Sequence, residues 1–159
     1  MALVERKKEL QGPAADLAEG HKGFEGLVLI PDTISEVSGR PVAGFRPDAQ
    51  ALRVLAAEAG IEVELAHPDD VEPGIYSEHD ADWVLPLMLE LTNGVTAGLV
   101  ANYLQRRLDE WRGHNSGTPT ARHREVISDG DSKIVRELEG PAPEVIDWLR
   151  SKEADGREG

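Results

Sequence analysis

The residues best suited to chemistry are histidines and aspartates in one acidic stretch, HPDDVEPGIYSEHDAD. His67 begins this stretch, and His79, Asp80 and Asp82 lie near its end. Imidazole nitrogens and carboxylate oxygens bind metal ions that activate water, so these residues suggest a small metal-dependent hydrolase. The helical pair of histidines four residues apart that marks many such sites is absent, and we favour Asp80 or Asp82 as the N-cap of a following helix.

No other motif assigns catalytic residues. The sequence lacks the G-x-S-x-G, G-x-G-x-x-G and G-x-x-x-x-G-K-[ST] patterns, so it points to no nucleotide, other cofactor or small-molecule substrate. The chain also has no cysteine, which excludes disulfides, thiolate metal sites and cysteine nucleophiles. A chain without disulfides is compatible with the cytosol, and we expect a cytoplasmic protein.

The charge balance is strongly acidic. The chain has 17 Lys and Arg against 30 Asp and Glu, a net charge of -13. Nucleic-acid binding requires a basic face, so no nucleic-acid partner is expected. The same charge supports one alternative function, an acidic inhibitor or immunity protein that masks a basic surface of its partner.

The longest apolar segment runs from Trp83 to Leu104, WVLPLMLELTNGVTAGLVANYL. It predicts one long helix from Asp80 or Asp82 to Trp111. Its length suits a membrane span, but Glu90 and several polar residues interrupt it, so a helix buried in protein is the better interpretation.

This segment is also the predicted interaction surface. Its second half is rich in small residues, which permit close approach of another helix. That partner is either the chain's own sheet or another chain. The residues assigned to the contact are Trp83, Leu87, Leu91, Gly94, Ala97, Gly98 and Ala101.

The predicted elements alternate in the order β-α-β-α-β-β-α. This order indicates an α/β (α+β) fold, a two-layer sandwich with a mixed sheet of about four strands and the long apolar helix. The first two strands should be parallel, and the last two should form a hairpin around Asp129-Gly130. The predicted strands are 26–30, 61–66, 122–128 and 133–138, the helices are 48–59, 80–111 and 143–152, and residues 33–47 form a long loop.

The predicted organisation is one domain with two loose ends. Residues 1–23 are expected to be a flexible lead-in, residues 24–152 a single α/β domain, and residues 153–159 a disordered tail. The length is that of one ordinary domain with a core of its own.

The order of elements over residues 25–150 resembles the small effector-associated constant component domains of predicted bacterial conflict systems. The resemblance rests on IEVELA, LTNGVTAGLVANYLQRRLDEW and REVISDGDSKIVRELEGPAPEVIDWL, and the 33–47 segment departs from it. It implies a non-enzymatic adaptor in antiviral defence that couples a sensor or effector to protein partners or to itself. We therefore expect a protein–protein interaction domain.

Overall fold

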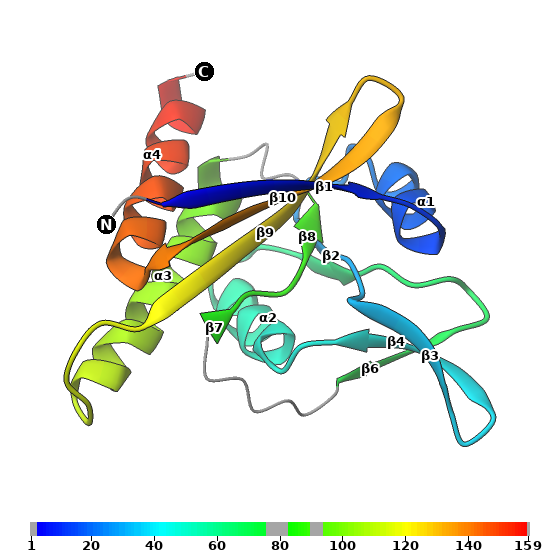
Figure 1. Ribbon diagram of the computed structural model, residues 1–159, viewed down its shortest axis with the longest axis horizontal. Coiled ribbons are helices and arrows are strands. Elements are labelled where there is room, and N and C mark those ends of the chain that lie inside the picture. The colour runs from blue at the N-terminus through cyan, green and yellow to red at the C-terminus, as the bar shows by residue number, and fades with distance from the viewer. Residues whose placement is uncertain (1–2, 76–82, 90–93, 159) are drawn as a thin grey trace.

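The computed structural model describes residues 3–75, 83–89 and 94–158. Strands and helices follow one another along the chain with a hairpin near the C-terminal end (Figure 1). The elements are β1 (Val4–Leu10), α1 (Pro13–Gly20), β2 (Leu27–Leu29), β3 (Thr33–Val37), β4 (Arg40–Phe45), α2 (Asp48–Glu58), β5 (Val63–Leu65), β6 (Glu72–Ile75), β7 (Trp83–Val84), β8 (Met88–Leu89), α3 (Gly94–Arg112), β9 (Thr120–Asp129), β10 (Ser132–Pro141) and α4 (Ala142–Glu158).

Two sheets organise these strands. The main sheet has 7 strands, in the order β1-β10-β9-β8-β2-β5, and β7 pairs with β9 beside that path. A smaller sheet of 3 strands has the order β3-β4-β6. The mixed α+β class is therefore confirmed, whereas the expectation of about four strands and of a simple β-α-β-α-β-β-α order is wrong.

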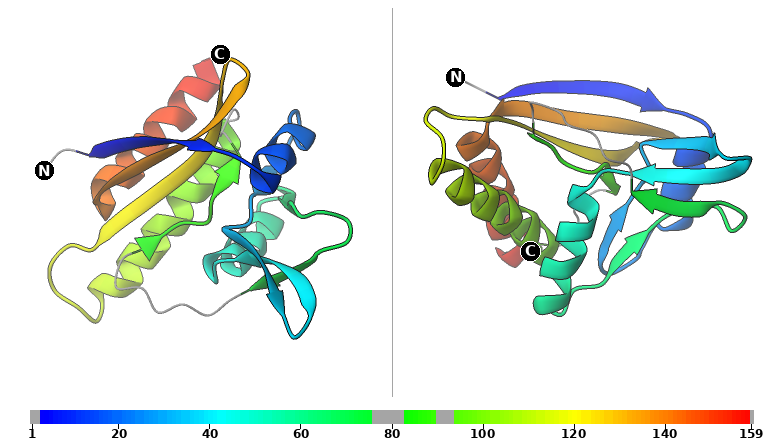
Figure 2. Two further views of the ribbon diagram at one scale, coloured as in Figure 1. Left: turned by 45° about the vertical axis from the view of Figure 1, so that its right-hand side comes forward. Right: turned by 90° about the horizontal axis from the view of Figure 1, so that it is seen from below.

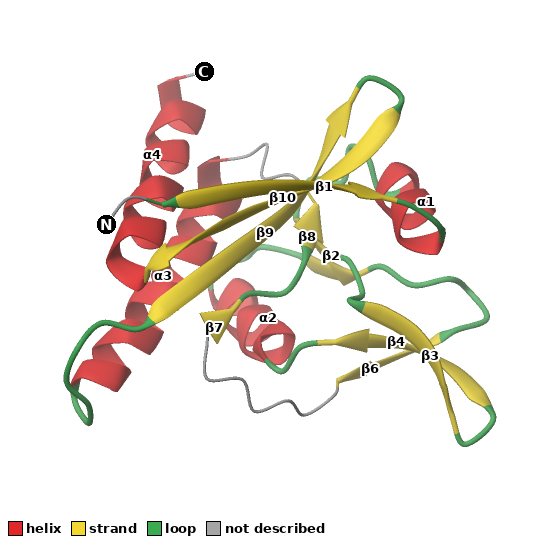
Figure 3. Cartoon of the chain, in the orientation of Figure 1, coloured by secondary structure: helices red, strands yellow, loops and turns green. Residues whose placement is uncertain are grey.

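The helices are unevenly distributed about the main sheet. α2, α3 and α4 gather on one side of the β1, β9 and β10 strands (Figure 2), and α1 lies apart from them (Figure 3). The larger core cluster lies on the side of α3 and α4 and includes Leu27, Leu104 and Leu149. A smaller cluster, with Val28 and Val126, receives partly buried residues of α1. Neighbouring residues of one strand thus enter different cores, as the alternation of strand side chains requires.

The segment predicted as a flexible lead-in contains β1 and α1. Residues Val4–Leu10 of β1 pair with β10 in antiparallel register from Glu139 to Lys133. Most of β1 is exposed, so its sequence, VERKKEL, lacks the apolar alternation that would mark a strand. Its partner, the long β10, supplies the backbone hydrogen bonds, and charged residues are typical of an edge strand.

The predicted long helix begins later than expected. Residues 83–89 contain β7 and β8, and α3 begins at Gly94. Trp83, Leu85 and Met88 are all buried, and a continuous apolar run fits a strand covered on both faces as well as a helix. Pro86 lies between β7 and β8, where an extended backbone suits a residue without an N–H. None of the described helices combines the length and apolar character that crossing a bilayer requires.

The predicted loop at 33–47 is largely a hairpin. β3 and β4 are antiparallel and are joined at Ser38 and Gly39, which both have positive φ, 54° and 79°. A two-residue turn of this kind matches the twist of paired strands. The Ser-Gly dipeptide was the available signal for it.

Several sequence predictions are confirmed. β2 and β5 are parallel, with Leu27 opposite Val63. The helix predicted over 48–59 is α2, which ends at Glu58, and Gly60 follows it with a φ of 72° and donates its N–H to the Ala57 carbonyl. β9 and β10 form the predicted hairpin, with Gly130 in the turn at a φ of 62°.

The C-terminal helix is longer than predicted. α4 continues to Glu158, so residues 153–158 of the segment expected to be a disordered tail belong to the helix. Val145, Ile146 and Leu149 of α4 are buried in the larger core cluster. This apolar stripe anchors the helix, and its helical backbone continues beyond the last core contact.

Candidate functional site

The predicted metal ligands are only partly described by the structure. His79, Asp80 and Asp82 lie outside the described residues. His67 is half-buried in the connection between β5 and β6, and its Nδ1 lies 2.9 Å from the Pro68 carbonyl oxygen. The described part of the chain contains no group of three or more residues arranged to hold a metal ion.

The small residues of the predicted interaction surface lie inside the folded chain. Ala97 and Ala101 are fully or almost fully buried, in the same core cluster as Val145 and Leu149 of α4. α3 and α4 pack along one another, which gives the small side chains an intrachain role.

The other residues of that predicted surface lie as follows. Three of them, Trp83, Leu87 and Gly98, are buried. Gly94 is the first residue of α3, and Leu91 lies outside the described residues. The buried positions among them are covered by the chain's own elements.

A buried group of charges lies where the β9–β10 hairpin meets α4. Glu125 is 0% exposed, and its carboxylate accepts a hydrogen bond of 2.6 Å from Nε2 of His123. A guanidinium nitrogen of Arg136 lies 3.2 Å away, and Nζ of Lys152 on α4 lies 3.3 Å away. We call these four residues the Glu125 cluster.

The Glu125 cluster keeps its carboxylate ionised. Burial by itself would raise the pKa of Glu125, but the hydrogen bond from His123 and the charges of Lys152 and Arg136 lower that pKa to about 2. Trp148 of α4 adds to the arrangement, because the Arg136 guanidinium lies 5.3 Å and the Lys152 ammonium 4.7 Å from its ring centre. The cluster therefore attaches α4 to the sheet, and its buried carboxylate is inaccessible to a ligand.

A second charged contact joins β9 to the connection between β2 and β3. Oδ1 of Asp32 lies 2.6 Å from Nη1 of Arg124. The other two guanidinium nitrogens of Arg124, Nε and Nη2, donate hydrogen bonds of 3.1 and 2.8 Å to the Leu85 carbonyl oxygen. One arginine thus serves a carboxylate and a backbone oxygen together. Nε of Arg46, which follows β4 directly, lies 3.6 Å from the other Asp32 carboxylate oxygen, so the same aspartate also contacts the smaller sheet.

A groove of about 480 Å³ lies between α2 and α3. At one end Tyr103 of α3 donates a hydrogen bond to Asp48 of α2, and Arg107 lies 2.8 Å from the same carboxylate. Burial and the Asp48 charge raise the pKa of Tyr103, so its hydroxyl stays a donor. Asp48, in the first turn of α2, thus holds the two helices together. The groove is lined by Ala51, Val54, Leu55, Glu58, Tyr103, Arg106, Arg107 and Glu110, and we call it the α2–α3 groove.

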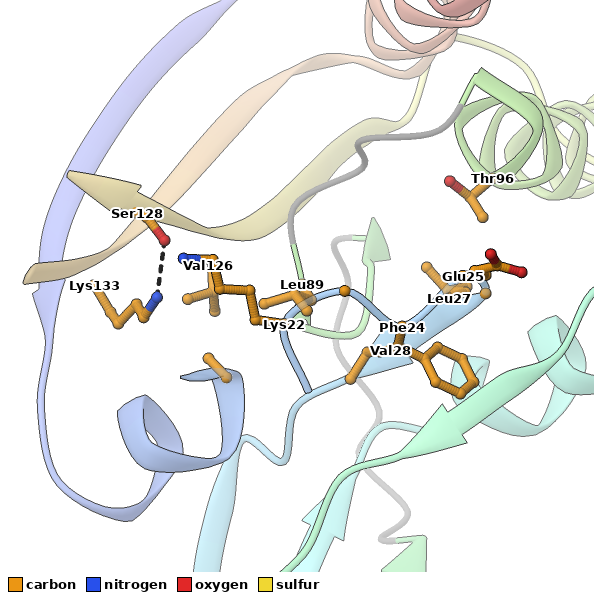
Figure 4. Close-up of a pocket in the computed structure, with 13 residues that line it drawn as sticks. Lys22, Phe24, Glu25, Leu27, Val28, Leu89, Thr96, Val126, Ser128 and Lys133 are labelled. Carbon is orange, nitrogen blue, oxygen red and sulfur yellow. Dashed lines mark hydrogen bonds between the residues drawn. The ribbon is translucent and has the colours of Figure 1, made fainter. Parts of the chain in front are cut away.

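A larger cavity, of about 600 Å³, lies between the start of β2 and the tip of the β9–β10 hairpin (Figure 4). Buried side chains of Leu27, Val28 and Val126 form an apolar part of its wall. In Figure 4 the side chains of Lys22 and Lys133 point toward Ser128 at one end. We call it the hairpin cavity.

Neither the Glu125 cluster nor the two lysines of the hairpin cavity were predicted from the sequence. His123 and Glu125 share one face of a strand, and the apolar face of the last helix had to cover some face of the sheet. Alternation along HREV was therefore a usable signal for an inward-facing acid. Lys22 and Lys133 carry no such signal, because they meet only when α1 and the hairpin tip come together.

Comparisons with known proteins add no relative. No protein-family model matches the chain, and no curated protein and no solved structure matches it either.

Proposed function

We propose that this chain is a non-enzymatic adaptor domain that self-associates through the α2–α3 groove. The observation that carries the proposal is an apolar strip open to solvent between two helices. Val54 is 56% exposed within this groove, beside Leu55 and Ala51. When a partner covers apolar side chains on a concave surface, it removes them from water, and this burial stabilises the complex.

The charges around the groove favour a second copy of this chain as the occupant. Arg106 and Glu58 lie 3.9 Å apart across it and are both mostly exposed. Glu110 of α3 also lines the groove. A two-fold interface brings the same patch of each copy together, so a patch that carries both signs can pair its arginines with its partner's glutamates.

The resemblance to effector-associated constant component domains supports the adaptor role. It would place the protein in the bacterial cytoplasm within a defence system, where a small domain couples a sensor or effector to its partners. Self-association is a common means of such coupling, because it raises the local concentration of whatever is attached.

The acidic inhibitor or immunity protein stays the alternative. It is supported by the net charge of -13. Association with a basic partner through such charge would weaken as salt is added, whereas an apolar groove contact would persist. A salt series therefore separates the two hypotheses.

The test is the molar mass in solution, measured by light scattering after size-exclusion chromatography. We expect the wild-type protein to have about twice the monomer mass of 17.3 kDa at high micromolar concentration. Val54→Glu should give the monomer, because it places a charge in the apolar strip of each copy.

Val95→Glu is the matched control. Val95 is 60% exposed on α3 but does not line the groove, so the same change there should leave the dimer intact. A wild-type protein that stays monomeric, or a Val54→Glu protein that dimerises as fully as wild type, contradicts the proposal.

A further inference from the structure

The hairpin cavity has the size and lining of a small-molecule site. Its volume of about 600 Å³ falls within the range of ordinary ligand pockets, about 300–1,000 Å³. Part of its wall belongs to the core, since Val28, Val126 and Ala18 are all buried. This wall suits the apolar body of a ligand.

Positive charge is concentrated at one end of the hairpin cavity. Nζ of Lys133 donates to the Ser128 hydroxyl at 2.8 Å and lies 2.6 Å from a carboxylate oxygen of Glu19. Lys22 points toward the same place in Figure 4 and also lines the cavity. The Lys133 side chain is only 12% exposed, so its position is fixed by the surrounding structure.

The acid at this end lies toward solvent. Glu19 is 62% exposed and is not a lining residue of the cavity, whereas both lysines and Ser128 are. An anion inside the cavity would therefore meet the two ammonium groups and the hydroxyl from the opposite side. Lys22 and Lys133 line the cavity itself, whereas the acids around them, Glu9, Asp16, Glu19 and Asp131, line a neighbouring pocket.

The lining also limits the ligand to one anionic group. Glu25 contributes a carboxylate to the lining, well separated from Ser128 in Figure 4. A second anionic group at the far end of a ligand would meet this carboxylate. Like charges in a partly enclosed site repel, so a molecule with two anionic ends is disfavoured.

We propose that the hairpin cavity binds a small molecule with one anionic headgroup and an apolar body, with Lys133, Lys22 and Ser128 holding the headgroup. The apolar body lies along Val28 and Val126. This site is independent of the α2–α3 groove, and the two share no lining residue.

The experiment titrates the full chain with three probes of equal carbon length and follows amide chemical shifts by NMR. Octanoate should bind saturably with a Kd in the millimolar range, as expected for a ligand of so few atoms. The shifts should concentrate at residues 22–28, Val126 and Lys133. Octanol, which lacks the charge, and octanedioate, which has two, should each bind several-fold more weakly.

Lys133→Met tests the role of the ammonium group directly. It should weaken octanoate binding about tenfold, as loss of a charge-assisted contact does. Arg53→Met, an exposed cation on α2 that does not line the cavity, should leave the Kd unchanged. A thermal melt of each variant establishes that it is folded.

Three results would overturn the proposal. They are no saturable shift with octanoate, equal binding of octanol and octanoate, and shifts confined to the α2–α3 groove. Failure here would leave the dimerisation result untouched, since that is measured without any ligand.

Discussion

The β9–β10 hairpin carries two groups of charges, one at its middle and one at its tip, and they differ in the position of the acid. At the middle, Glu125 is fully buried and the cations of Arg136 and Lys152 are directed at it. At the tip, the acid is Glu19, which is mostly exposed, while the Lys133 side chain is mostly buried.

This difference separates a structural cluster from a candidate binding site. A buried carboxylate has lost its hydration, so its charge is stabilised by the protein groups that contact it, and the loss of any of them is costly. An exposed carboxylate keeps much of its hydration, so it contributes little to stability and can share its cation with another anion. The burial of the acid, rather than the number of charges, decides what each cluster can do.

The largest effect is expected from Glu125→Gln. The change keeps the shape of the side chain but removes the buried charge that Arg136 and Lys152 contact, so the free energy of unfolding should fall by about 3–5 kcal/mol. Urea denaturation followed by circular dichroism measures it.

Glu64→Gln is the matched control, because Glu64 is exposed on β5 of the same sheet. Its free energy of unfolding should stay within about 0.5 kcal/mol of wild type. A Glu125→Gln protein as stable as this control would show that the Glu125 cluster does not anchor α4.

A somewhat smaller loss of folding stability is expected when the pH is lowered. Folding lowers the pKa of Glu125 from 4.5 to about 2, so the unfolded chain binds more protons in this range. Stability should therefore be complete above the unfolded pKa and fall as the pH drops from about 4.5 toward 2. The contribution of this one group is about 3 kcal/mol.

The measurement is a series of urea titrations across that pH window. Glu125→Gln should lose less stability than wild type over the same window, because the titrating group is gone. Identical pH dependence in the two proteins would contradict the assigned role of Glu125.

The smallest effect on stability is expected at the hairpin tip. Lys133→Met removes the partner of an exposed carboxylate, so the urea midpoint should change by only a small fraction of the Glu125→Gln effect. The pKa of Glu19, which the hydrogen bond from Lys133 and its charge lower, should return toward its ordinary value. Carboxyl chemical shifts followed through an acid titration measure that return.

A large loss of stability in Lys133→Met would remove the contrast between the two clusters. The tip would then be structural, like the middle. An unchanged pKa of Glu19 in the variant would show that the two side chains do not interact in solution.

Local sequence predicted the elements whose signal is carried by neighbouring residues. The apolar run at Leu27–Leu29, the end of the helix predicted over 48–59 and the Asp-Gly turn of the last hairpin each report a local backbone requirement. These features were found where they were expected. They account for the confirmed parallel pair and the confirmed hairpin.

Elements that depend on a distant partner were missed. β1 has no apolar alternation, and its backbone is satisfied by β10 from the other end of the chain. Residues 83–89 were assigned to a helix because an unbroken apolar run fits either kind of buried element. Leu85 donates its N–H to the Arg122 carbonyl, a bond that no local pattern could reveal.

The candidate sites follow the same division. The sequence singled out the small residues of α3 as an interaction surface and left open whether they pack within the chain or between chains, and in the structure Ala97 and Ala101 are buried within the chain. It predicted the strands 122–128 and 133–138 without distinguishing the roles of neighbouring positions along them. Alternation along a strand gives the faces, and only the assembled layers show which face is buried.

The sequence by itself determined the acidic balance, the hairpin, the parallel pair and the apolar stripes of the helices, because composition and local periodicity are properties of the chain. Tertiary structure decided that Glu125 is enclosed by α4 and that Lys22 and Lys133 meet at a cavity. Burial and charge proximity arise only when distant segments pack together. They set the pKa of a carboxylate and the accessibility of an ammonium group, and hence the role of each.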